Sequence, residues 1–304
     1  MLFTSYGFIA FLAVLFVLYY VIPKRFQWLL LLAADVVFYA CAGWKGLCFM
    51  AATVAVSWAA TNLMGASLSA QKAYLSSEAG KALERPERKA YKKQCEKRRK
   101  LIFVLALIAD LGILAALKYT NFLINNVNAI FSADIASVDW VLPLGISFYT
   151  FQTVSYVIDV YWEKVEPEKN ILRVALFTSF FPLLIQGPIS RFGDLKETLY
   201  AEHKADFKQI SFGLQRILWG YFKKLVIADR LLVAVTALCG DPEAYTGAYV
   251  FIGAVLYAAE LYADFTGGID ITIGIAQVLG ISVKENFIRP YFSRNIAEYW
   301  RRWH

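Results

Sequence analysis

Charged residues are scarce in this chain of 304 residues: Lys, Arg, Asp and Glu together make up 18% of it, whereas 59% is hydrophobic. A soluble domain of this length carries about a quarter charged residues. Here the apolar residues also occur in long runs, which indicates several membrane spans. The sequence therefore predicts an all-α polytopic membrane protein, with a single membrane-embedded domain over residues 1–304.

Cysteine and histidine are also rare, with four and two residues respectively. The cysteines show no spacing typical of a disulfide framework or a metal site. Neither His203 nor His304 can complete a zinc site with them at a familiar spacing, so no metal site is predicted. His203 lies among charges in the run AEHKADFK, and we interpret it as a solvated surface histidine.

Several common catalytic motifs are missing as well. The chain has no GxxxxGK[ST] or GxGxxG phosphate loop, no GxSxG nucleophile elbow and no HExxH zinc motif. Two function classes remain for apolar spans that carry polar groups. One is an acyl-transfer enzyme in the membrane, and the other is a polytopic transporter or ion-coupled carrier. No internal repeat, a common feature of transporters, is apparent.

The net charge of +7 is concentrated in one hydrophilic insert at residues 71–100, between apolar segments. The positive-inside rule explains this position better than nucleic-acid binding does, so no nucleic-acid partner is predicted. Residues 120–140, in contrast, contain no Lys or Arg. We therefore expect the basic insert in the cytoplasm, the loop 120–140 outside and the N-terminus outside. An acidic partner or anionic lipid is the alternative use of the insert.

Apolar segments predict the spans of the first half of the chain, at about 3–22, 26–42, 47–64 and 101–117. Asp35 falls inside the second, where a structural hydrogen bond between helices is favoured over a functional role. Later segments are less regular. Pro143 and Gly145 break the run 141–162, which is tolerated where backbone lines a cavity. Central charges make 207–238 an interfacial helix that leads into a span.

The segment 248–279 carries three acids in an apolar run. Acids at membrane depth are costly, and by default they face a cavity and serve a function. Glu260 and Asp264 lie four residues apart and share a helix face. For Glu260 and Asp270, structural hydrogen bonding between helices is equally favoured. The pair at 267–268, Gly-Gly, is expected to loosen the helix.

The last twenty residues, ENFIRPYFSRNIAEYWRRWH, predict a new amphipathic helix after a break. Pro290 ends any helix that runs into it, and Ser293 or Asn295 can cap the next one. One predicted face carries Ile296, Tyr299, Trp300, Trp303 and His304, and the other carries Glu298, Arg301 and Arg302. Aromatic surroundings would keep the imidazole of His304 neutral and competent as a base. The alternative is an interfacial residue beneath a tryptophan belt.

These residues closely resemble the signature of the membrane-bound O-acyltransferase family, and most nearly its bacterial alginate O-acetylation branch. The runs that carry the resemblance are Arg289-Pro290-Tyr291, Ser293-Arg294-Asn295-Ile296 and Tyr299-Trp300-Arg301-Arg302-Trp303-His304. Further similar runs are PLGISFYTFQ at 143–152 and YADFTG at 262–267. The resemblance covers about 143–304, and the first 140 residues match only in hydropathy. The D-alanyl transfer protein of teichoic acid modification has a similar C-terminal block.

The resemblance implies a helical bundle with broken, re-entrant and interfacial helices. It also implies transfer of an acyl group, with acetyl favoured and D-alanyl as the alternative, to hydroxyls of an exported polysaccharide. The donor would be cytoplasmic acetyl-CoA or another acyl thioester, with no bound cofactor. The lipid bilayer surrounds the protein in a bacterial cell membrane, and an extracytoplasmic transfer partner is expected.

The resemblance also suggests site residues. His304 would position substrate or relay a proton, and the principal histidine is expected beyond residue 304, so that this chain alone would be incomplete and inactive. Pocket residues by motif position are Asp264, Asn286, Arg289, Arg302 and Trp303. Arg191 and Gln152 are second-tier candidates.

Overall fold

The computed structural model describes residues 3–140, 142–240 and 243–303, and no β-strand occurs in these ranges. Three helices are long and apolar enough to cross a membrane: α3 (Trp44–Ser76), α5 (Arg85–Phe131) and α12 (Ala248–Val278). The shorter α1 (Tyr6–Val21) is apolar as well. The prediction of an all-α membrane protein is confirmed.

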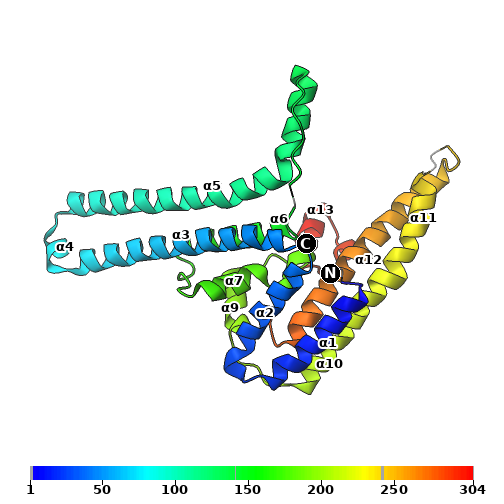
Figure 1. Ribbon diagram of the computed structural model, residues 1–304, viewed down its shortest axis with the longest axis horizontal. Helices are drawn as coiled ribbons and strands as arrows, with labels where there is room; N and C mark the ends of the chain where they lie inside the picture. The colour runs from blue at the N-terminus through cyan, green and yellow to red at the C-terminus, as the bar shows by residue number, and fades with distance from the viewer. Residues whose placement is uncertain (1–2, 141, 241–242, 304) are drawn as a thin grey trace. The chain divides into compact units, whose positions relative to one another are not determined.

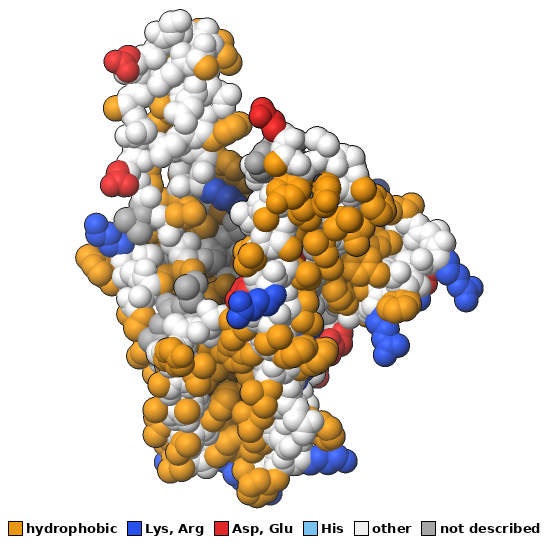
Figure 2. Space-filling view, turned by 90° about the vertical axis from the view of Figure 1, so that its right-hand side faces the viewer, with side chains coloured by type: hydrophobic (Ala, Val, Ile, Leu, Met, Phe, Trp, Pro, Cys, Tyr) orange, Lys and Arg blue, Asp and Glu red, His pale blue; other side chains and the backbone are white. Residues whose placement is uncertain are grey.

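The chain forms two compact units, which we describe separately. Unit 1 comprises residues 1–30, 182–190 and 197–304, and unit 2 comprises residues 31–181 and 191–196. The prediction of one domain stays a prediction. Many large apolar side chains are exposed, and Figure 2 shows them spread over much of one face, with charged residues in isolated groups. Such a surface suits lipid rather than water.

Unit 2 contains most of α2 (Gln27–Ala40), together with α3, α4 (Glu78–Ala82), α5, α6 (Ile146–Tyr161) and α7 (Ile171–Ser179). Asp35 of α2 is fully buried, and its carboxylate accepts hydrogen bonds from the Ser179 hydroxyl at 2.9 Å and the Phe181 amide at 2.8 Å. These contacts agree with the structural role expected for Asp35. Buried Asp110 of α5 accepts a hydrogen bond of 2.6 Å from Ser57 of α3.

The basic insert is almost wholly helical. Helix α3 continues to Ser76, the short α4 follows, and α5 begins at Arg85 and runs back beside α3 (Figure 1). The Ser77 side chain caps α4, and a reciprocal capping box between Glu84 and Glu87 starts α5. The insert is thus an extension of two long apolar helices.

The predicted loop at 120–140 is wrong in part, because α5 remains helical to Phe131. The chain then runs back along the helix. The amide side chain of Asn121 bonds both the N–H and the C=O of Val138, and that of Asn128 bonds the same groups of Ile135, at 2.8–3.0 Å. The side-chain amides of α5 thus satisfy backbone hydrogen-bonding groups of this extended segment, as a neighbouring strand would do.

Unit 1 is built around the crossing of α10 (Phe207–Tyr221) and α12. A π-helical segment, Phe222–Ala228, joins α10 to α11 (Asp229–Gly240), and the short α13 (Ile296–Arg302) follows the 3₁₀ turn Pro290–Phe292. Helix α12 continues without a break through Gly267 and Gly268, and the expected loosening at these glycines stays a prediction. These glycines also permit close packing against neighbouring segments.

Candidate functional site

Glycines set the distance between α10 and α12. A Cβ on Gly220 would lie 2.6 Å from the Gly267 carbonyl oxygen, and one on Gly213 would lie 2.9 Å from that of Gly274. Each helix thus presents two glycines seven residues apart to its neighbour. Contacts this short to backbone leave no room for a side chain, so the two backbones approach as small-residue membrane interfaces do.

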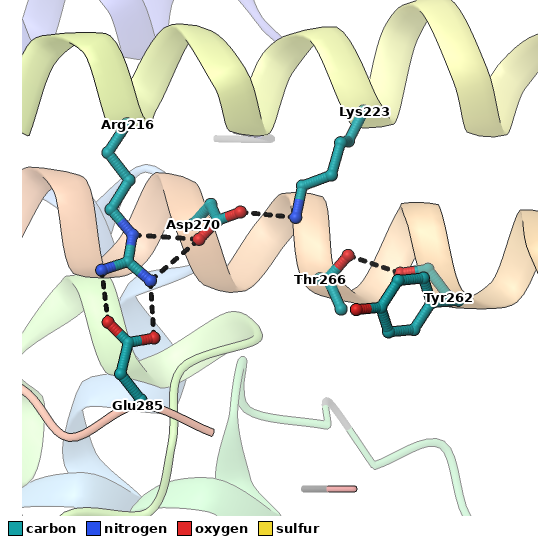
Figure 3. A network of polar contacts seen from close by, with 6 residues as sticks. All are labelled: Arg216, Lys223, Tyr262, Thr266, Asp270 and Glu285. Carbon is teal, nitrogen blue, oxygen red and sulfur yellow. Dashed lines mark hydrogen bonds and ion pairs between the residues drawn. The ribbon is translucent and has the colours of Figure 1, made fainter. Parts of the chain in front are cut away.

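Arg216 lies between the two glycines of α10 and Asp270 between those of α12. Figure 3 shows the contacts of these two residues with Lys223 and Glu285. Arg216 of α10 donates from Nε to Oδ1 of Asp270 on α12 at 2.9 Å, and its Nη2 forms an ion pair with the same oxygen, also at 2.9 Å. Its Nη1 and Nη2 also donate to Glu285, at 2.5 and 2.7 Å. Lys223 Nζ pairs with the second oxygen of Asp270. One guanidinium therefore joins two carboxylates, and one carboxylate joins two cations.

A second pair lies beside this network, where Lys224 Nζ donates to Asp264 Oδ1. Lys223 and Lys224 are consecutive and both belong to the π-helical segment, yet both reach acids of α12. A π-bulge changes the direction of neighbouring side chains and is frequent at functional sites. Three cations thus meet three carboxylates in this part of unit 1.

The network anchors the irregular segment 281–289. The bidentate hydrogen bonds from Arg216 hold the pKa of Glu285 below its ordinary value, and burial opposes this only in part. Glu285 therefore stays a carboxylate and fastens the chain immediately before Asn286. The arrangement positions this segment, and its paired charges leave no free base within it.

Trp303 lies in an aromatic cluster at the end of this segment. Its ring centroid is 5.0 Å from that of Phe287, 5.5 Å from that of Tyr299 and 6.1 Å from that of Tyr262. The Ile288 amide donates to the Arg302 carbonyl at 3.0 Å, which ties the segment to the end of α13. The residues around Trp303 are therefore held by both packing and backbone hydrogen bonds.

Helix α13 begins as predicted, with the Asn295 side chain accepting from the Glu298 amide at 2.8 Å. Glu298 and Arg302, predicted to share a helix face, form an ion pair, with Arg302 Nη2 2.5 Å from Glu298 Oε1. The predicted aromatic face is only partly correct, because the helix ends at Arg302 and Trp303 is extended. Trp300 remains 64% exposed. His304 lies outside the described residues.

The remaining candidates occupy different settings. Asn286 is half-buried, and Arg289 is exposed with a left-handed φ of 47°, directly before the 3₁₀ turn. Gln152 and Arg191 belong to unit 2. Gln152 is buried, and its side-chain amide donates to the Phe177 carbonyl at 2.6 Å. Arg191 forms an ion pair with Asp159, with 3.5 Å between Nη1 and Oδ1. Unit 1 thus holds Asp264, Asn286, Arg289, Arg302 and Trp303.

Sequence reasoning did not find the roles of Arg216 and Glu285. A signal was present, since Gly213, Arg216, Gly220 and Lys223 alternate at spacings of three and four residues. This places small and basic residues on one helix face. Asp270 follows the structural alternative predicted for it, because it links α10 and α12.

The prediction that His203 is a solvated surface residue is wrong. Its Nδ1 lies 3.0 Å from the Tyr19 hydroxyl, and its amide donates to Gln27 Oε1 at 2.8 Å. A Cβ on Gly280 would lie 2.4 Å from the imidazole ring. Burial lowers the pKa of His203, although a hydrogen bond with the Gly280 backbone opposes that shift. The charged neighbours of His203 in the sequence suggested exposure, whereas its contacts come from segments distant in the sequence, which the sequence alone does not show.

These features define a helical membrane protein in which Arg216, at the α10–α12 crossing, holds the segment that leads to α13. No family model matches the chain. A "Probable alginate O-acetylase AlgI" of Azotobacter vinelandii is 35% identical over 314 residues, covering all of this chain and 56% of that protein. The peptidoglycan O-acetyltransferase of Helicobacter pylori is 32% identical, covering 68% of this chain and 44% of its own length.

The teichoic acid D-alanyltransferase of Bacillus subtilis is 27% identical over 53% of this chain and 41% of its own length. From these similarities, the chain belongs to the membrane-bound O-acyltransferase family. It spans about half the length of the curated relatives it matches. The alginate relatives extend the similarity from the predicted 143–304 to the whole chain.

Proposed function

We propose that this protein transfers an acyl group, acetyl in particular, to hydroxyls of an exported polysaccharide. The observation that carries the proposal is the similarity to an alginate O-acetylase along the whole chain. The peptidoglycan O-acetyltransferase supports the same chemistry on a second glycan. None of these relatives is named as a carrier, which disfavours the transporter alternative.

Acetyl is favoured over D-alanyl by the extent of the similarity. The acetylase match includes the α3–α5 hairpin, whereas the D-alanyltransferase matches only 53% of the chain at lower identity. The donor would be acetyl-CoA or another acyl thioester on the cytoplasmic side. An extracytoplasmic partner would pass the acetyl group to the polysaccharide, unless the membrane protein delivers it directly.

The reaction joins an acceptor oxygen to the acyl carbon and breaks the carbon–sulfur bond of the thioester. The acceptor proton leaves through a base, and the thiolate leaving group takes up a proton. A neutral histidine suits such proton movement near pH 7. We assign His304 to positioning or relay, and Asp264, Asn286, Arg289, Arg302 and Trp303 to the surrounding pocket. Donors directed at the tetrahedral oxyanion must complete the site.

The test uses the complete protein in a bacterium whose own gene for it is deleted. We expect His304→Ala and Asp264→Ala to lower polysaccharide acetylation by at least about tenfold, since a positioned proton-transfer group contributes about 10²–10⁴ in rate. Alkali-released acetate from exported polysaccharide measures the activity. Glu260→Ala, on the same face of α12, is the matched control and should have a smaller effect.

Membrane amounts of each variant are measured by immunoblot, so that loss of protein is separated from loss of activity. Wild-type acetylation in Asp264→Ala would remove that residue from the pocket. Release of D-alanine in place of acetate would replace the proposed acyl group.

The proposed orientation has a test of its own. Because translocation of many basic residues is disfavoured, the insert 71–100 should lie inside and residues 132–140 outside. A membrane-impermeant thiol reagent applied to intact cells should label Ser132→Cys and not Arg88→Cys, in a background lacking the four native cysteines. Labelling of Arg88→Cys alone would reverse the orientation.

A further inference from the structure

Unit 2 contains two adjoining cavities where α3 and α5 meet the turn at 162–169. Their volumes are about 560 and 440 Å³, and both are lined by Leu68, Lys72, Arg99 and Glu163. No residue of the proposed acyl-transfer pocket lines them. They are therefore separate from the site described above.

Arg99 is the unusual member of this lining. It is only 9% exposed, and its Nη1 donates to the side-chain oxygen of Gln71 on α3. Within the described residues, no carboxylate pairs with its guanidinium. A buried charge is normally paired, because leaving it uncompensated away from water is expensive. Arg99 is thus a buried cation that lines a cavity and lacks a counter-charge.

Other cations surround the same space. Lys72 and Arg99 line both cavities, Lys169 lines the larger, and Arg88 and Lys92 line the smaller. Acids are fewer, and Glu163 pairs with Lys72 at 3.3 Å. That pair is exposed, with 65% and 45% of the two side chains accessible, so it contributes little stability. A bound anion can therefore replace Glu163 as the partner of Lys72 with little loss of stability.

The position of the cavities along the helices indicates which anion. Arg99 lies two residues before Leu101, where the apolar part of α5 begins. Leu101, Leu105 and Ile108 follow on α5 with 56–64% of each exposed. The cationic site thus lies at the level along α5 where the apolar, membrane-spanning part of the helix begins, which is the level of lipid headgroups. Basic pockets between membrane helices bind anionic headgroups in this way.

We propose that the cavities between α3 and α5 bind the phosphate of an anionic phospholipid, with Arg99 and Lys72 as its principal partners. The guanidinium of Arg99 offers the planar donor arrangement that matches phosphate oxygens. The bound phosphate supplies the counter-charge that Arg99 lacks. This site does not depend on the acyl-transfer activity.

The experiment uses the complete protein, purified in an uncharged detergent. Thermal unfolding is followed during titration with dioleoylphosphatidylglycerol, with dioleoylphosphatidylcholine and with inorganic phosphate. Phosphatidylglycerol should raise the unfolding midpoint in a saturable manner, because a ligand that binds the folded state stabilises it. Phosphatidylcholine should have no such effect, and inorganic phosphate should compete weakly with phosphatidylglycerol.

Three variants locate the site. Arg99→Gln should raise the half-saturating phosphatidylglycerol concentration by about tenfold and Lys72→Gln by about fivefold, given about 1 kcal/mol per basic residue near an anionic surface. Arg98→Gln removes an exposed neighbouring cation that lines neither cavity, and should change the concentration by less than about twofold. Lys72 is a second variant because its side chain is 65% exposed, so its replacement should leave the fold intact.

The results separate the proposal from its competitors. An equal loss in Arg98→Gln would mean diffuse attraction to the whole basic insert and would overturn the site. Equal stabilisation by phosphatidylcholine would overturn the requirement for an anion. Saturation by inorganic phosphate with no effect of phosphatidylglycerol would assign the cavities to a soluble phosphate compound and overturn the lipid.

Discussion

The two compact units surround a buried aspartate between helices in different ways. In unit 1, Asp270 receives two cations, Arg216 and Lys223. In unit 2, Asp110 accepts a hydrogen bond from the Ser57 hydroxyl, and no cation pairs with it among the described residues. Both carboxylates link two long helices, but the first link depends on charge and the second does not require it.

This difference separates structural charges from charges available to a ligand. A network whose cations and carboxylates balance, such as the one around Asp270, has no strong demand for another partner. Arg99 has a side-chain amide as its partner and therefore still lacks a counter-charge. Burial alone does not mark a functional residue, and Arg99 is set apart because it also lines a cavity that a ligand can enter.

The largest change in the free energy of unfolding should come from replacing a buried aspartate by asparagine, which removes the charge and keeps the shape. Asp270→Asn leaves Arg216 and Lys223 partly buried without a carboxylate between them, and should lower the free energy of unfolding by about 3 kcal/mol. Asp110→Asn keeps an acceptor for Ser57 and should change it by less than about 1 kcal/mol. Reversible unfolding of the full-length protein in detergent, followed by circular dichroism, measures both. Equal losses would mean that the two links do not differ as described.

Replacing a glycine by alanine should change the free energy of unfolding by a smaller amount, with opposite sign in the two units. Gly220→Ala places a Cβ against the Gly267 carbonyl and should cost about 2 kcal/mol, as overpacking does. A Cβ added at Gly112 of α5 would meet no atom within 4 Å, so Gly112→Ala should stabilise the helix by up to about 1 kcal/mol. The same unfolding measurement applies. Stabilisation by Gly220→Ala would contradict the close approach of α10 and α12.

The sequence predicted elements better than contacts. Apolar runs located α3, α5 and α12, and the cap at Asn295 was correct, because length and capping are local properties. The ion-pair network required knowing that α10 crosses α12, which brings Arg216 within reach of Glu285, 69 residues away. The signature runs indicated which residues gather near Trp303, but not that α13 ends at Arg302.

The smallest expected effect concerns His203, which is half-buried in unit 1. Its pKa in the folded protein is below the ordinary value of 6.5, mainly because of burial. The unfolded chain therefore binds a proton more readily, and stability must fall as the pH drops below about 6.5. Glu285 also has a lowered pKa, but its contribution is lost only as the pH falls below about 4.5.

Unfolding between pH 7 and pH 5 isolates the contribution of His203 from that of Glu285. We expect the stability of the wild-type protein relative to that of His203→Gln to fall over this interval, because glutamine cannot be protonated there and every other group is common to both proteins. Tyr19 contacts the imidazole, but a phenol stays neutral over this interval, so its hydroxyl does not add a second titration. Parallel pH profiles for the two proteins would show that His203 titrates as a solvated residue, as its neighbours in sequence predicted.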